Sequence, residues 1–107
     1  MDDYEEITLC AASAYEEKYY FNPEFAALPE VVKQELQIVC VLFTQEVGGI
    51  LALVYLEDGT LELRTRQWED DFSYDEIGSV LKIKELQREK AELFESLELF
   101  FRTFYLG

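Results

Sequence analysis

Clustered carboxylates are the side chains of this sequence best suited to chemistry. The stretch WEDDFSYDE, at residues 68–76, contains Glu69, Asp70, Asp71, Asp75 and Glu76. Carboxylates bind hard cations such as Ca²⁺ or Mg²⁺, and paired carboxylates can catalyse hydrolysis. The spacing does not match an EF-hand loop, however, and helix capping explains the last two acids. We therefore favour a solvated, helix-capping run over a cation site, and we assign no catalytic or metal-ligating residue to it.

The other common catalytic groups are missing or isolated. The sequence has no histidine, which removes the most frequent general base and metal ligand. Cys10 and Cys40 are isolated single cysteines, far apart in the sequence. We therefore expect reduced, buried thiols that act as small hydrophobic side chains. No phosphate-loop, dinucleotide-binding or CxxC motif occurs. The sequence thus favours a protein that is not an enzyme and has no cofactor. A carboxylate-based small-molecule or metal-dependent enzyme is the alternative.

Composition and charge narrow the class of partner. The chain has 107 residues, half of them hydrophobic, which fits one domain spanning residues 1–107 with a genuine core. Its formal charge of −14 repels DNA, RNA and anionic lipid. There is no apolar run of about 18 residues and no basic leader before an apolar segment. We therefore expect a cytoplasmic protein that binds neither nucleic acid nor membrane.

Two helices are expected in the first half of an α+β fold. Residues 3–20 place apolar side chains at intervals of three and four, which predicts a helix that ends at Asn22-Pro23. The second helix is expected to begin at Pro29 and to end at Gly48-Gly49. The β-branched residues within 38–45 leave a strand open as the alternative, and that strand would complete a three-stranded meander.

A β-hairpin is expected next, because Asp58-Gly59 separates two runs of alternating residues. A two-residue turn would place Ala52, Val54 and Leu56 on one apolar face. It would leave Leu51, Leu53 and Tyr55 on the opposite face, against Glu62, Arg64 and Arg66 of the second strand. The first strand is then apolar on both faces, which is typical of a strand inside a sheet. A lone hairpin is only marginally stable, so another segment or a second copy of the chain must cover it.

A long C-terminal helix, packed on the sheet, is the last expected element. Residues 73–76 form a capping box, and no proline follows, so the helix is expected to run to about Phe104. A seam of apolar residues with Lys90 inserted follows a heptad pattern. The segment KIKELQREK, at residues 82–90, holds four of the nine basic residues. It is either a charge-balanced helix surface or the counterpart of the acidic N-terminal segment, within one chain or across a dimer.

Four stretches of the sequence resemble a small family of acidic, functionally uncharacterised proteins of about this length from Firmicutes bacteria. They are KYYFNPEF (18–25), ELQIVCVLFTQEVGGI (35–50) with EDGTLEL (57–63), and YDEIGSVLKIKELQREK (74–90). The resemblance spans nearly the whole chain. It implies membership of that family and supplies no mechanism.

We expect a non-catalytic protein–protein interaction module that associates with itself as a homodimer. A chaperone or decoy for a basic protein is a further alternative, because the chain is strongly acidic. The side chains expected to make the contact are the second hairpin face and two aromatic residues of the last helix: Leu51, Leu53, Tyr55, Phe94 and Phe101.

Overall fold

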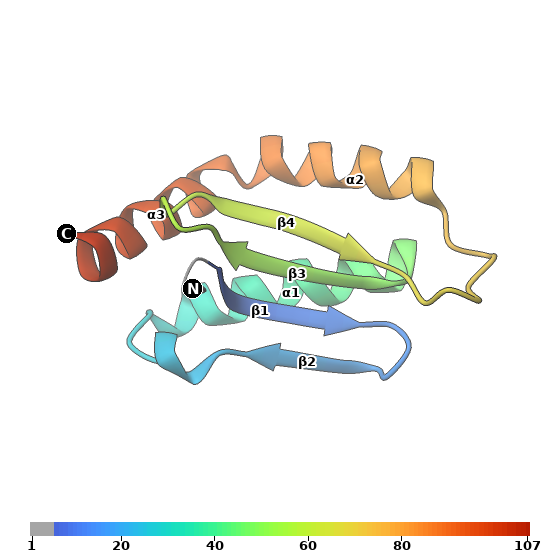
Figure 1. Ribbon diagram of the computed structural model, residues 1–107, viewed down its shortest axis with the longest axis horizontal. Helices are drawn as coiled ribbons and strands as arrows, with labels where there is room; N and C mark the ends of the chain where they lie inside the picture. The colour runs from blue at the N-terminus through green and yellow to red at the C-terminus, as the bar shows by residue number, and fades with distance from the viewer. Residues whose placement is uncertain (1–5) are drawn as a thin grey trace.

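The structure is a computed structural model, and it describes residues 6–107 (Figure 1). The α+β class is confirmed. In chain order the elements are β1 (Ile7–Ser13), β2 (Lys18–Phe21), a 3-10 turn (Pro23–Phe25), α1 (Glu30–Val47), β3 (Ile50–Tyr55), β4 (Leu61–Arg66), α2 (Glu76–Glu89), α3 (Ala91–Phe101) and a π-helical turn (Arg102–Leu106).

The strands form one four-stranded antiparallel sheet in the order β2-β1-β3-β4 (Figure 1). The hairpin β3–β4 is therefore extended by β1 of the N-terminal hairpin. Strand β3 lies inside the sheet, as its apolar residues on both faces predict. The cover that it needs comes from other segments of the same chain.

The helix predicted for residues 3–20 is wrong from residue 7 onward, and residues 3–5 lie outside the described part. Strands β1 and β2 occupy this segment, joined by a turn. The pairing of β1 with β3 shifts between Thr8 and Cys10, so that Leu9 and Cys10 are both fully buried. This bulge breaks the alternation that identifies a strand, and neighbouring buried residues then imitate helical spacing.

Helix α1 confirms the second predicted helix, and the alternative strand at residues 38–45 is wrong. The buried side chains of α1 include Leu36, Cys40 and Phe43, which lie on one side of the helix at intervals of four and three. The helix ends where the N–H of Gly48, at φ +90°, donates to the carbonyl of Thr44. Packing of this stripe therefore outweighs the local β preference of the branched residues.

The β3–β4 hairpin forms with a register that differs by one residue from the expected one. Leu56 and Thr60 pair around a three-residue loop, and Gly59 has φ +90°. Leu53 consequently pairs with Leu63. A shift of one residue exchanges the two faces of a strand. The prediction that Leu51, Leu53 and Tyr55 oppose Glu62, Arg64 and Arg66 is therefore wrong, since their actual partners are Thr65, Leu63 and Leu61.

The C-terminal helix begins two residues later than the capping box predicted at residues 73–76, and it is not continuous. Asp75 caps α2 by accepting a hydrogen bond from the N–H of Gly78 at 2.8 Å. The helix breaks at Lys90, where φ is −111° and ψ is 25°, and α3 continues in a new direction (Figure 1). The break lets α3 pack on the sheet beside β4, which a straight helix of thirty residues and ~45 Å would overshoot.

The core lies between the sheet and the helices. Helix α1 packs on β1, β2 and β3, and α3 contacts β4, so the helices cover one sheet face (Figure 1). The opposite face is open and carries exposed side chains such as Tyr20. The fully buried side chains include Leu36 and Phe43 of α1, Leu51, Leu53 and Tyr55 of β3, and Leu97 of α3.

Candidate functional site

The five side chains predicted to make a protein contact all lie in the core. Leu51, Leu53 and Tyr55 are 0% exposed, Phe94 is 7% exposed and Phe101 is 4% exposed. All five belong to one cluster of buried residues. In the folded protomer they are therefore not available as a contact surface.

Tyr55 and Phe101 meet directly within this cluster. Their rings stack with centroids 4.2 Å apart. The hydroxyl of Tyr55 donates to the carbonyl oxygen of Leu97 at 2.9 Å, and burial raises the pKa of this hydroxyl. The hydroxyl stays protonated near neutral pH and donates its one proton to α3. Tyr55 therefore anchors α3 to β3.

The two cysteines are free and buried, as predicted, and they lie together. The sulfur atoms of Cys10 and Cys40 are 3.8 Å apart, which joins β1 to α1. Their hydrogen bond and the burial of the site raise the pKa of the Cys40 thiol. Burial also raises the pKa of Tyr19, whose hydroxyl has no hydrogen-bond partner within residues 6–107. Cys40 and Tyr19 are thus protonated near neutral pH, which is the wrong state for a nucleophile or a base.

The acidic run is used to build the loop between β4 and α2. The hydroxyl of Tyr15 donates to the carboxylate of Asp71, which also accepts from the N–H and hydroxyl of Ser73. The ring of Tyr15 stacks on Trp68 with centroids 4.0 Å apart. Within residues 6–107, no three acidic or cysteine side chains converge as ligands of a metal ion. The contacts of Asp71 favour a structural role, as the capping interpretation predicts for its neighbours.

Replacing Tyr15 by phenylalanine tests that role, because the ring stack stays and only the hydroxyl is lost. The hydrogen bond from Tyr15 is the largest cause that lowers the pKa of Asp71. We therefore expect Tyr15→Phe to raise the pKa of Asp71 toward its ordinary value, measured by NMR titration of the carboxyl carbon.

The linked stability follows from the same sign. A carboxyl group with a lowered pKa in the folded state stabilises it above the unfolded pKa, about 3.9 for Asp, and loses this effect as pH falls through the folded pKa. Tyr15→Phe should thus reduce stability at neutral pH and converge with the parent chain in acid. Tyr20→Phe, at a half-exposed tyrosine, is the control. An unchanged pKa of Asp71 would contradict the role assigned to Tyr15.

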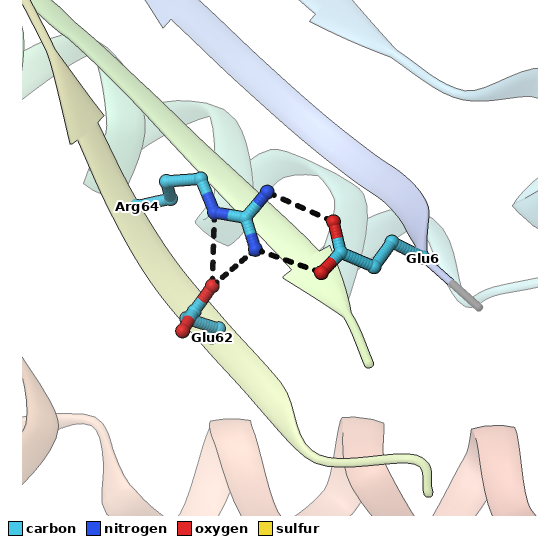
Figure 2. A network of polar contacts seen from close by, with 3 residues as sticks. All are labelled: Glu6, Glu62 and Arg64. Atoms are coloured by element: carbon cyan, nitrogen blue, oxygen red, sulfur yellow. Dashed lines mark hydrogen bonds and ion pairs between the residues drawn. The ribbon is translucent and has the colours of Figure 1, made fainter. Parts of the chain in front are cut away.

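An ion network crosses the open face of the sheet (Figure 2). Arg64 of β4 reaches over β3 and donates to both carboxylate oxygens of Glu6, at 3.1 and 3.3 Å. Its Nε also donates to Glu62 at 2.9 Å. Arg64 lowers the pKa of Glu6, chiefly through the hydrogen bond. Because two carboxylates already engage the guanidinium, Arg64 is not a free anion site. Val54 of β3, which pairs with Glu62 on the open face of the sheet, is only 4% exposed.

A hollow of about 490 Å³ lies between the β1–β2 turn and α1. Its size is that of a small-molecule site, but such sites are mostly apolar with a few converging polar groups. Here the lining mixes hydroxyl and amide side chains with one acidic and one basic residue. Because neither charge predominates, the lining indicates no class of ligand. The polar lining residues are Ser13, Glu17, Lys18, Tyr19, Gln37, Thr44 and Gln45.

Two exposed apolar stripes on the helices were missed by the sequence interpretation. The α1 stripe is Val31, Ile38 and Leu42, which are 69%, 57% and 47% exposed. The α2 stripe is Ile77, Val80 and Leu81, which are 77%, 54% and 62% exposed. The sequence does contain a signal for the α2 stripe, because Ile77, Val80 and Leu81 lie outside the heptad seam that contains Ile83 and Leu86. It is readable only once the packed side of the helix is known.

Comparison with known proteins adds a family but no chemistry. A family model described as "Family of unknown function (DUF6145)" matches residues 6–107. No curated protein and no solved structure matches the chain. Across the described residues, no helix combines the length and apolar content needed to cross a bilayer. The interpretation of function therefore depends on the surface of the molecule.

Proposed function

The chain belongs to DUF6145, a family of unknown function, and we propose that it acts as a non-catalytic interaction module that self-associates. The observation that carries this proposal is the exposure of the α2 stripe, where Ile77 is 77% and Leu81 is 62% exposed. Single exposed apolar residues are ordinary, but a run of them on one helix marks a contact surface.

Helical pattern supports the same conclusion. A surface helix of a monomer normally carries polar side chains opposite its packed side. In α2 the buried residues are Ser79 and Leu86, and the side opposite them begins with Ile77 and Leu81. Helix α1 likewise exposes Ile38. A partner that covers the α2 stripe, or the α1 stripe as the alternative, would remove apolar area from water.

The contact residues of this proposal differ from those expected from sequence. Leu51, Leu53, Tyr55, Phe94 and Phe101 are buried, so the α2 stripe takes their place, and the α1 stripe is the alternative surface. We place the protein in the cytoplasm, where Cys10 and Cys40 would stay reduced. We also propose that the other members of the family are acidic proteins from Firmicutes bacteria.

Light scattering coupled to size-exclusion chromatography tests self-association. We expect the mean mass to rise above the 12.6 kDa of one chain as the protein concentration rises, because association follows mass action. Runs at low and high salt separate apolar from charged contributions. A mass of one chain at every concentration and both salt levels would overturn the self-association.

A further inference from the structure

We propose that the α2 stripe binds a second copy of this chain, with the two α2 helices antiparallel about a twofold axis near Leu81. This inference rests on the proposed function and specifies its interface. A twofold interface uses the same patch on both copies, so the patch must complement itself. The sequence of α2 meets that requirement in both apolar and charged residues.

The side of α2 that faces away from the core has two different ends. Ile77, Leu81, Lys84 and Arg88 follow one another at intervals of four, three and four, which places them on one side of the helix. All four are exposed, whereas Leu86 is buried on the other side. The N-terminal half of this side is apolar and the C-terminal half is basic.

The charges of Lys84 and Arg88 are available to a partner. Of the four bases in residues 82–90, Lys82 pairs with Glu46 of α1 at 3.0 Å and Lys90 pairs with Glu35 at 3.1 Å. Lys84 and Arg88 form no ion pair within residues 6–107. Two bases of the segment, Lys82 and Lys90, therefore bind α1. The other two, Lys84 and Arg88, are exposed.

The acidic counterpart lies at the other end of the same helix. Asp75 caps α2 and Glu76 is its first residue, and both are exposed. In an antiparallel pair centred on Leu81, a residue n positions after the centre faces the residue n positions before it. Lys84 then faces the partner's Gly78, two residues from the partner's Glu76, and Arg88 faces the partner's Tyr74, next to the partner's Asp75. A parallel pair would instead place like charges together.

The net charge makes this complementarity decisive. Two chains that each carry −14 repel one another at long range. Lys84 and Arg88 lie beside the apolar stripe without an ion pair among residues 6–107, so they offer an acidic second copy the opposite charge. A second copy is favoured over a foreign protein, since one helix supplies both the acidic and the basic half of the match.

The interface is expected to be weak. Helix α2 has 14 residues and is therefore about 21 Å long. One helix face supplies less than the roughly 800 Å² per partner of a standard interface. We expect a dimer that dissociates on dilution and whose affinity falls with salt, because part of it is electrostatic.

Alanine substitutions locate the interface. Ile77→Ala with Leu81→Ala should raise the dissociation constant by roughly tenfold or more, measured by analytical ultracentrifugation of the full chain. Alanine favours helix, and both sites are exposed, so the fold should remain, which circular dichroism checks. Ile38→Ala with Leu42→Ala, on the α1 stripe, is the matched control and should leave the constant within about twofold.

A charge exchange tests the antiparallel arrangement. A chain with Lys84→Glu, and a second chain with Glu76→Lys, should each dimerise more weakly alone, because each would place like charges together at the contact between positions 84 and 76. Mixed, they should form a heterodimer, in which every such contact joins opposite charges again. Failure of the mixture to associate more tightly than either variant alone would overturn the antiparallel arrangement.

The outcomes separate this inference from the proposed function. If the parent chain dimerises and only the α1 substitutions disrupt the dimer, the α2 interface is wrong and self-association stands. If the parent chain is a monomer throughout, self-association itself falls. If the α2 substitutions weaken the dimer and the exchanged charges restore it, both are supported.

Discussion

Replacing Leu53 by alanine is expected to lower the free energy of unfolding by about 3 kcal/mol. Leu53 is 0% exposed and lies in the centre of β3, inside the cluster that joins the sheet to α1 and α3. The substitution removes three buried carbon atoms and leaves a cavity, and such changes cost about 2–5 kcal/mol. For a domain with a total stability of about 5–15 kcal/mol, the loss is large. Urea denaturation followed by circular dichroism measures it.

Leu99→Ala is the matched control for this experiment. Leu99 of α3 is 65% exposed, so the same chemical change should alter stability by no more than about 0.5 kcal/mol. Similar effects at the two positions would contradict the burial of β3. They would also return the Leu51–Tyr55 side of the strand to consideration as an assembly surface.

The sequence predicted well those elements whose signals are local. Pro29 and Gly48 bound α1 where proline and glycine are expected. Asp75 caps α2 two residues after the predicted cap at Ser73. The Asp58-Gly59 pair lies in the turn of a real hairpin. In each case a side chain or a backbone conformation acts within a few residues, so the sequence alone carries the information.

The register of the hairpin is the point at which the predicted site failed. Asp-Gly suits both a two-residue turn and a three-residue loop in which glycine alone has positive φ, and the loop is the one present. The difference of one residue moved Leu51, Leu53 and Tyr55 from the supposed outer face to the core. Turn residues predict that a hairpin forms more reliably than they predict which face is buried.

The remaining errors come from contacts distant in sequence. The bulge at Leu9 is defined by pairing with β3, more than forty residues away, and it hides the strand pattern of β1. The break at Lys90 places Phe94 and Phe101 in the core, although nothing in the neighbouring sequence is a proline or glycine. Both features depend on tertiary packing, which outweighs local propensity.

Gly49→Ala is expected to destabilise the protein by about 3 kcal/mol, because two penalties add at this position. Gly49 has φ +70°, where an L-residue costs about 1–2 kcal/mol. A Cβ atom would lie 2.5 Å from a ring carbon of Tyr74 and 2.8 Å from the carbonyl oxygen of Arg66. The backbone oxygen at the end of β4 cannot move without disturbing the sheet, and overpacking of this kind costs about 1–3 kcal/mol.

Gly59→Ala isolates the conformational penalty. Gly59 also has positive φ, at +90°, but the nearest atoms to an added Cβ belong to the side chain of Arg102. That side chain can swing away from the turn, so only the conformational cost of about 1–2 kcal/mol should remain. Urea denaturation of both variants should therefore place Gly49→Ala below Gly59→Ala in stability. Equal losses would show that the contact of Gly49 with β4 is not tight, and that its conformation alone requires glycine where α1 turns into the sheet.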